Sequence, residues 1–315
     1  MSSDGQEGPY PEVMTATSPS VSDQVAALEA GRAFVDLSMW RKVRVGGSEA
    51  IAWLNDLLSA ELDGLAPATS RRSLLLSPTG RVRAEVAVLA DDQGFVLIQD
   101  PAQDGGIDDA LAPYVLSSDV AVHDVTAELG LLAFPGVPAD RQSNLGPGVV
   151  SRPSVLGSGF DLLSSSEDVE AARAGASGAG LSEAMLEALE AWSIRRGRPR
   201  VGVDLGPDAL PHEAEVGDLI DYHKGCFLGQ EAVAKVRNLG HPPFVLLAVS
   251  GNGPLSPGDP VRADGADVGL VTSADVTGAP ETAAIVRVRW ASREADLWSA
   301  DGEPLAVRAT AALSD

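Results

Sequence analysis

The chain holds one cysteine in 315 residues, and its 23 lysines and arginines face 45 aspartates and glutamates. A single cysteine excludes an intramolecular disulfide, and no basic, apolar signal sequence opens the chain, so we expect a cytoplasmic protein. The net charge of -22 argues against binding to nucleic acid or to anionic membranes. No stretch approaches the roughly 18 apolar residues that a membrane-spanning helix needs.

Several binding motifs are also absent. The sequence has no Gly-x-Gly-x-x-Gly after a strand and no Gly-x4-Gly-Lys-Ser/Thr, which excludes the simple nucleotide sites. It has neither a Cys-x-x-Cys pair nor a His-Glu-x-x-His sequence, so we expect no resident metal. With 44% hydrophobic residues, this length suffices for about two to three globular domains.

Hydrophobic periodicity predicts an α+β protein with a β-barrel at its C-terminal end. Residues 1–21 are rich in Ser, Pro and Gly and are expected to form a disordered leader. Alternating helices and antiparallel strands suggest α+β domains over 22–125 and 126–240. The predicted helices cover 22–34, a segment capped by Ser48 with Ile51, Leu54 and Leu58 on one face, about 107–116, and 181–192, with a further helix from Gly229 or Gln230. The predicted strands before the barrel cover 41–45, 72–77, 82–90, 95–99, 119–125, 128–134 and 201–204.

The last 75 residues, 241–315, have a different pattern. Short strands separated by Gly- and Pro-containing turns are typical of a small barrel. We expect these strands at 244–249, 259–263, 266–272, 282–290 and 304–310.

The run Lys224-Gly225-Cys226-Phe227-Leu228-Gly229-Gln230-Glu231 contains the lone cysteine. Flanking glycines suggest a tight backbone path, and a thiol beside Lys224 is a typical setting for a reactive thiolate. Three uses of Cys226 remain open at this point. It could be a nucleophile with a histidine base, a ligand in a mixed or shared metal or cluster site, or a redox thiol. A buried cysteine that acts as a small hydrophobe is the ordinary alternative. The candidate bases are His123, His212, His223 and His241, and the candidate co-ligands are His212, His223, Glu213 and Glu215.

Basic residues concentrate around this motif. Such a cluster is either a solvated surface or an anion site, in which arginine binds carboxylates or phosphates through two hydrogen bonds. Its members are Arg195, Arg196, Arg198, Arg200, Lys224, Lys235 and Arg237.

The motif resembles the hallmark Lys-Gly-Cys-aromatic-x-Gly-Gln-Glu of the YgfZ family, the folate-binding relatives of the glycine-cleavage T-protein. The resemblance covers about residues 24–310. Further matches are Asp36-Leu37-Ser38, the helix sequence 47–55, the hairpin 75–82, Gly197 to Asp204, Leu210 to Glu213, and 269–273.

The resemblance implies a ring of two intertwined α+β domains and a C-terminal barrel, with tetrahydrofolate in the central opening. It also implies support of iron–sulfur cluster assembly or repair, with cluster proteins as partners and Cys226 as the functional thiol beside Lys224. The residues implied to bind the folate cofactor are Arg195, Arg198, Glu190, Glu213, Gly225, Gly229 and Gln230.

Two departures from the T-protein bear on activity. Its catalytic aspartate, in a Gly-x-x-Asp-Asp pattern, aligns with Ala84, and Glu85 is expected to face the other side of the strand. Aminomethyl transfer is therefore not the first hypothesis. Its folate-binding glutamate aligns with Arg195, which can only donate hydrogen bonds, so Glu190 and Glu213 are candidate replacements.

The leading hypothesis is a tetrahydrofolate-binding accessory protein in iron–sulfur metabolism that uses Cys226. The first alternative is a folate-dependent one-carbon transferase, either an aminomethyltransferase or a demethylase. The second alternative is a non-catalytic binding protein for another small anionic ligand.

Overall fold

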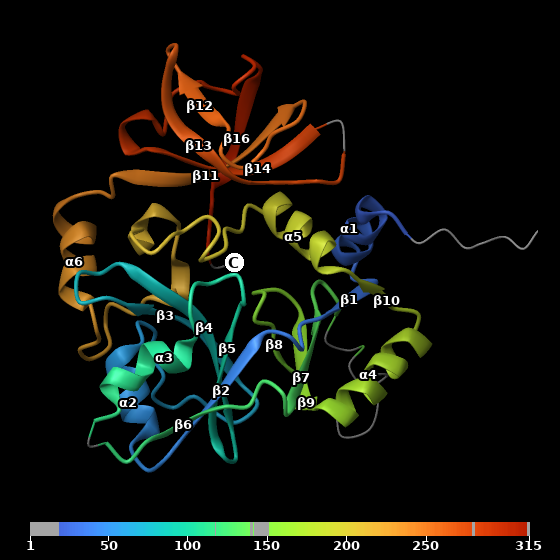
Figure 1. Cartoon of the computed structure of the whole chain (residues 1–315), viewed down its shortest axis with the longest axis vertical. Coiled ribbons are helices and arrows are strands. Elements are labelled where there is room, and N and C mark those ends of the chain that lie inside the picture. The colour runs from blue at the N-terminus through green and yellow to red at the C-terminus, as the bar shows by residue number, and fades with distance from the viewer. Residues whose placement is uncertain (1–18, 117, 139–140, 142–150, 279–280, 314–315) are drawn as a thin grey trace, which may run out of the picture.

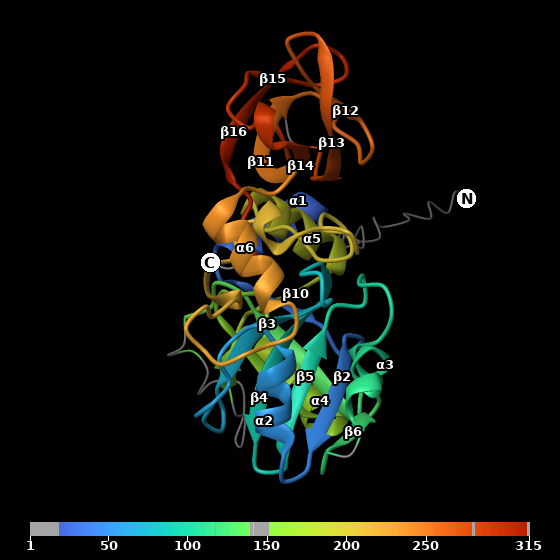
Figure 2. The ribbon, with the colours of Figure 1, turned by 90° about the vertical axis from the view of Figure 1, so that its left-hand side faces the viewer.

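The computed structural model describes residues 19–116, 118–138, 141, 151–278 and 281–313. Within this part of the chain, two five-stranded sheets lie side by side and a closed six-stranded barrel stands over them (Figures 1 and 2). The predicted α+β class with a C-terminal barrel is confirmed. No helix in the described ranges is both long and apolar enough to cross a membrane.

The first sheet is an antiparallel meander with added strands, in the order β3-β4-β5-β2-β6. The predicted hairpins of 72–99 are confirmed. Helices α2 (Ala50–Leu57) and α3 (Ile107–Leu111) contribute to the core on one face. The strands are β2 Arg41–Gly46, β3 Ser70–Leu76, β4 Val82–Asp91, β5 Gly94–Gln99 and β6 Ala121–Asp124.

The second sheet has the order β10-β1-β7-β9-β8 and includes a parallel pair, β1 with β10. Strand β1 precedes every strand of the first sheet in sequence, so the two sheets are intertwined along the chain. Helix α4 (Ser166–Gly178) packs on β7 and β9, and α1 (Val21–Glu29) packs on α5 (Leu186–Arg195). The strands are β1 Ala33–Asp36, β7 Leu129–Phe134, β8 Ser151–Pro153, β9 Phe160–Ser165 and β10 Ser182–Ala184.

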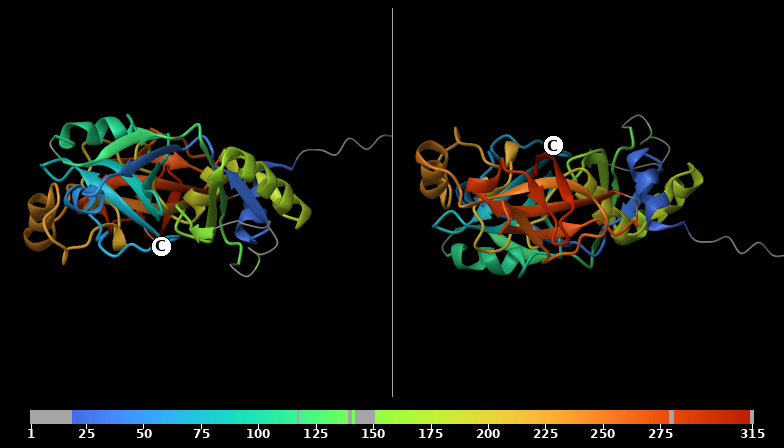
Figure 3. Two further views of the ribbon diagram at one scale, coloured as in Figure 1. Left: turned by 90° about the horizontal axis from the view of Figure 1, so that it is seen from below. Right: turned by 90° about the horizontal axis from the view of Figure 1, so that it is seen from above.

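The barrel follows α6 (Gln230–Leu239) and closes in the order β11-β14-β13-β12-β15-β16. All five predicted strands are confirmed, while β15 was too short to predict. Seen from above, the barrel covers the middle of the molecule, with α6 on one side and α1 on the other (Figure 3). Its strands are β11 Phe244–Asn252, β12 Pro260–Ala263, β13 Ala266–Ala274, β14 Glu281–Arg289, β15 Leu297–Trp298 and β16 Pro304–Thr310.

Short 3-10 helices occur in the connections. They are η1 Ala112–Tyr114, η3 Pro211–Glu213, η4 Gly217–Leu219 and η5 Trp290–Ser292.

Three local predictions were wrong. The helix over 22–34 ends at Glu29, because Gly31 has a φ of 61° and turns the chain into β1. The helix predicted over 181–192 begins only at Leu186, after strand β10. The expected strand over 201–204 is a turn closed by a single bridge between Val201 and Leu205. The predicted leader 1–21 lies mostly outside the described residues.

The two sheets and α5 share one hydrophobic core. Val35 and Leu131 of the second sheet, Leu89 and Ile98 of the first, and Trp192 of α5 belong to the same buried cluster. Packing of this kind fixes the separation of the sheets, and part of the same cluster also lines a cavity between the first sheet and α5.

Candidate functional site

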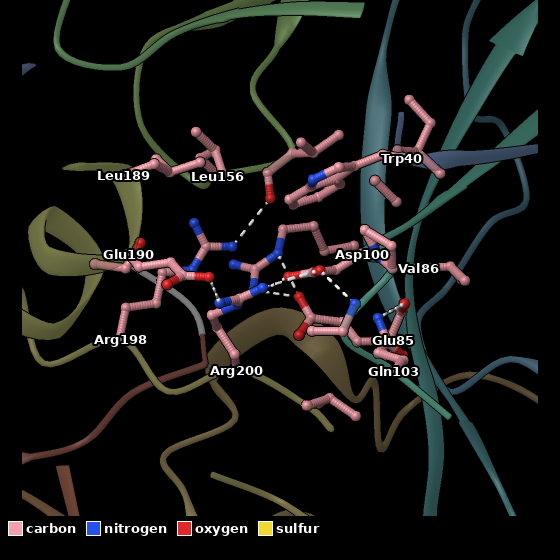
Figure 4. Close-up of a pocket in the computed structure, with 18 of the residues that line it drawn as sticks. Trp40, Glu85, Val86, Asp100, Gln103, Leu156, Leu189, Glu190, Arg198 and Arg200 are labelled. Atoms are coloured by element: carbon pink, nitrogen blue, oxygen red, sulfur yellow. Dashed lines mark hydrogen bonds and ion pairs between the residues drawn. The ribbon is translucent and has the colours of Figure 1, made fainter. Parts of the chain in front are cut away.

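A central cavity of about 370 Å³ lies between β3, β4 and β5 of the first sheet, helix α5, and the loop before β9 (Figure 4). Six charged side chains reach it from distant parts of the sequence. They are Arg72, Glu85, Asp100, Glu190, Arg198 and Arg200.

Glu85 is the carboxylate that the first sheet presents to the cavity. Arg72 on β3 donates to its Oε1 through Nε at 3.0 Å and through Nη2 at 2.5 Å. The main chain of Glu85 is held by Gln103, which accepts from Glu85 N at 2.8 Å and donates to Glu85 O at 2.9 Å. Both the side chain and the main chain of Glu85 are thus fixed by hydrogen bonds.

The prediction that Ala84 and Glu85 face opposite sides of β4 is confirmed, but the residue that faces the cavity is Glu85. Leu75 pairs with Ala84 while Leu76 pairs with Val82, so Arg83 is an extra residue in a bulge. Ala84 consequently packs in the core with α2, and Glu85 faces the cavity. Alanine therefore stands where the T-protein aspartate is expected, and the strand presents a carboxylate to the cavity one position later, at Glu85.

Arg200 organises the other side of the cavity. Its Nε and Nη2 bind the two oxygens of Asp100 at 3.0 and 3.1 Å, and its Nη1 binds Glu190 Oε1 at 2.6 Å. Burial lowers the pKa of Arg200, but the hydrogen bonds to and charges of Asp100 and Glu190 outweigh it and raise this pKa above its ordinary value. The side chain of Glu190 is 52% exposed, so the carboxylate of α5 is accessible.

Apolar side chains form the remaining walls. Trp40 and Met39 come from the turn after β1, and Leu189 comes from α5. Val155 and Leu156 come from the loop before β9, where Arg198 Nη2 donates to Val155 O at 3.0 Å. A mostly apolar cavity with a few convergent polar groups is typical of small-molecule sites.

Of the predicted ligand-binding side chains, the structure brings Glu190 and Arg198 together in this cavity. Arg195 turns to the barrel, where its Nε binds Asp275 at 2.5 Å and its Nη2 binds Thr277 Oγ1 at 2.6 Å. Glu213 is fully buried and accepts from Arg287 Nε at 2.6 Å. Each of these two side chains is thus bound to a barrel residue, and neither lines the cavity.

The cysteine motif lies apart from the cavity. Cys226 is exposed, and none of residues 224–231 is among the residues that line the cavity. Lys224 is 8% exposed, and its Nζ donates to Asn55 O and Oδ1, Leu58 O and Ala60 O at 2.7 to 2.9 Å. Burial lowers the pKa of this ammonium, against the effect of nearby acidic residues. Since these hydrogen bonds hold the lysine inside the fold, its predicted role at the thiol has no support.

Gly225, Gly229 and Gln230 shape this loop and do not line the cavity. Gly229 has a φ of 81°, and a Cβ there would lie 2.5 Å from Ser77 O, so only glycine fits against the β3–β4 hairpin. Gln230 Nε2 donates to Gly225 O at 3.4 Å. These contacts give Gly229 and Gln230 of the motif a role in the conformation of the loop.

The metal-ligand and histidine-base alternatives gain no support. Among the described residues, no three His, Cys, Asp or Glu side chains are placed to hold a metal ion. His212 Nε2 instead contacts Tyr222 Oη at 3.0 Å, and burial lowers the pKa of this imidazole.

Sequence reasoning missed Arg72, Glu85, Asp100, Gln103 and Trp40. Glu85 lies close after the hairpin 75–82, which resembles that of the T-protein, and this position was the one sequence signal for a role in the site. The bulge that turns it toward the cavity has no signature in one sequence.

Two five-stranded sheets under a closed six-stranded barrel define the class of T-protein-like folds. The aminomethyltransferase T structure from Bartonella henselae superposes with a TM-score of 0.76 at 18% identity, covering 90% of this chain and 88% of that one. At this identity the likeness concerns the fold.

No protein-family model matches the chain. An aminomethyltransferase of Frankia alni is 30% identical over 266 residues, which cover 76% of this chain and 72% of the relative. One from Mycobacterium avium is 28% identical, covering 89% and 83%. The chain belongs to the aminomethyltransferase family.

A chloroplastic protein of Arabidopsis thaliana named "Putative transferase" is 24% identical over 78% of this chain, and the match spans 62% of that relative's length. These relatives carry transferase names, so the narrower YgfZ resemblance stays a prediction.

Proposed function

We propose that this chain is a folate-dependent one-carbon transferase that binds tetrahydrofolate in the central cavity. The observation that carries the proposal is Glu85, a carboxylate fixed by Arg72 and Gln103 and directed into the cavity. Membership of the aminomethyltransferase family supports this reading over an accessory role.

The cavity suits the bicyclic part of a reduced folate. Its volume of about 370 Å³ is in the range of small-molecule sites, and Trp40 offers an aromatic face to a flat ring. The pterin edge carries N–H donors, and the exposed carboxylate of Glu190 can accept from them. Arg198 is the candidate for the acidic tail of the ligand.

Tetrahydrofolate, when bound, supplies amine nitrogens that accept a one-carbon unit. The protein's part is to orient the donor and the folate and to exclude water from the cavity. Glu85 attracts the amine of the donor and holds its proton, and Arg72 prevents this carboxylate from rotating away. Glu190 would hold the pterin edge, while Leu156 and Leu189 would form an apolar wall that limits the access of water to the cavity.

Calorimetric titration with tetrahydrofolate tests the binding site. We expect Glu190→Gln to raise the Kd by about tenfold or more, because a hydrogen bond to a charged group contributes about 1.5–3 kcal/mol. Glu187→Gln is the matched control: Glu187 is an exposed residue of the same helix and does not line the cavity. If the unsubstituted protein shows no binding at about 1 mM, the ligand is not folate, and another small anion becomes the better hypothesis.

The exposed thiol favours a second candidate, the folate-binding accessory protein in iron–sulfur cluster metabolism. In that protein Cys226 acts on cluster partners while the cavity holds the folate. Turnover separates the candidates, since only a transferase consumes an aminomethyl or methylated donor.

Under the transferase proposal, Glu85→Gln lowers turnover by about 100-fold or more, as expected when a positioned acid–base group is lost. Cys226→Ser leaves turnover and thermal stability unchanged. Under the second candidate there is no turnover, and Cys226→Ser fails to rescue a cluster-deficient strain. If turnover were lost in Cys226→Ser and unchanged in Glu85→Gln, the assignment of the site to the cavity would be wrong.

A further inference from the structure

The C-terminal segment after the barrel returns into the middle of the molecule. In Figure 1 the chain leaves the barrel downward and ends beside the sheets. Three successive amides bind three separate regions: Ala311 N to Leu246 O at 3.1 Å, Ala312 N to Gly197 O at 3.1 Å, and Leu313 N to Glu215 O at 2.7 Å. The segment thus joins β11, the end of α5 and the loop after η3.

The side chains of this segment are buried as well. Ala311 and Leu313 are 0% exposed and belong to a core cluster with Leu74 and Leu76 of β3. Burial of apolar surface favours this docked position over a solvated tail. The segment is therefore a fixed part of the core, and it packs on the face of β3 that carries the Arg72 side chain.

The carbonyl of Leu313 accepts a hydrogen bond from Arg72 Nη2. The same guanidinium holds Glu85 through Nε and Nη2. The side chains of Arg72 and Glu85 are only 10% and 15% exposed, so water has little access to replace either partner. A planar guanidinium bound to acceptors on two sides has one orientation.

We propose that Ala311–Leu313 is a positioning segment of the central cavity: Leu313 O orients Arg72, and Arg72 orients Glu85. Without the carbonyl, Nη2 keeps one acceptor, and the guanidinium can rotate together with the carboxylate it binds. The identity of the affected ligand rests on the proposed function, whereas the orientation of Glu85 does not. The consequence is that full affinity in the cavity depends on the docked segment, which lies some 230 residues beyond Glu85 in sequence.

Two shortened chains test this. A chain ending at Thr310 lacks the segment, and a control chain ending at Ser314 keeps Leu313 O as a peptide carbonyl. The first readout is the carboxyl carbon resonance of Glu85 in protein labelled on glutamate, assigned by its loss in Glu85→Gln. The second readout is tetrahydrofolate affinity.

We expect the Glu85 resonance to move in the chain ending at Thr310 and to stay in place in the control. Affinity should fall about three- to tenfold in the former, the equivalent of one lost hydrogen bond. An unmoved resonance in a folded chain ending at Thr310 would show that the segment only packs, and the proposal would be wrong.

Arg72→Lys in the full chain tests the same role without shortening the chain, so the test does not depend on the folding of the shortened chain. Lysine keeps the charge but lacks the fork that binds two acceptors at fixed angles. We expect the Glu85 resonance to move in Arg72→Lys, and the added deletion of 311–315 to cause no further movement. If the shortened chain does not fold, an unmoved resonance in Arg72→Lys overturns the proposal. If the full chain fails to bind tetrahydrofolate, the proposed function is wrong, and the resonance still decides the role of the segment.

Discussion

At the scale of single residues, Asp161 shows how the cavity wall is supported from behind. It is 1% exposed and accepts from Ser154 Oγ and Val155 N, both at 2.6 Å. Burial raises the pKa of this carboxyl from 3.8 to about 7, against the effect of these hydrogen bonds and of Arg198. Val155 lines the cavity, so a titrating acid sits directly behind the ligand site.

The raised pKa of Asp161 makes a prediction for stability against pH. Between about pH 4 and pH 7, Asp161 binds more protons in the folded state than in the unfolded state, so its contribution to stability falls as pH rises through that range. Asp161→Asn removes this dependence. We expect the difference in unfolding free energy, wild type minus Asp161→Asn, to fall by about 1.4 kcal/mol per pH unit there. Urea unfolding at pH 5, 6 and 7 measures it, and a constant difference would show that Asp161 ionises normally.

At the scale of elements, the cysteine loop is anchored to the end of α2. The Lys224 ammonium lies among carbonyl oxygens of the last turn of α2 and the residues after it, where a cation is favoured by the unsatisfied C=O groups. Leu228 N also donates to Asp56 O at 3.0 Å. These hydrogen bonds therefore hold the loop that carries the exposed Cys226 against the end of α2.

Removal of this ammonium should be costly. We expect Lys224→Met to lower the unfolding free energy by about 3 kcal/mol, because buried carbonyls lose a charged donor. Lys235→Met, at an exposed position of α6, is the matched control and should change it by less than about 0.5 kcal/mol. Denaturant titration gives both values, and equal losses would contradict the anchoring role.

At the scale of the whole molecule, the carboxylate of Asp204 links the barrel to the loop that carries Arg200. Asp204 is 4% exposed; it accepts from Thr272 Oγ1 at 2.5 Å and Ser273 Oγ at 2.7 Å on β13, and from Arg200 N at 2.8 Å. Burial raises the pKa of Asp204, with these bonds opposing the shift. The barrel is thereby linked to the residue that organises Glu190 and Asp100.

Thr272→Val tests this link. Loss of a hydroxyl bound to a buried carboxylate should lower the unfolding free energy by about 2 kcal/mol. The barrel should also separate more readily, seen as faster limited proteolysis near residue 241. Thr282→Val is the control, since its hydroxyl binds Gly253 O within the barrel at 2.7 Å. Faster cleavage in both variants would point to the barrel itself and away from the link.

Regular elements could be predicted from sequence because their signals are local. Strand periodicity and turn glycines sufficed for β3 to β5 and for most of the barrel, and Gly229 marked the start of α6. The end of the first helix and the start of the helix predicted from 181 were wrong because a left-handed glycine, Gly31, and the parallel pairing of 182–184 with β1 override local preference.

By itself, the sequence determined the fold class, the barrel and a family-typical motif, since hydrophobic period and turn chemistry act over a few residues. Only the tertiary structure decided which side chains meet: Arg72, Glu85, Glu190 and Arg200 come from four segments, and a bulge at Arg83 selects the carboxylate. It also placed Lys224 inside the core and Arg195 at the barrel. The physical reason is that burial and hydrogen-bond partners depend on packing between distant segments, which no local pattern records.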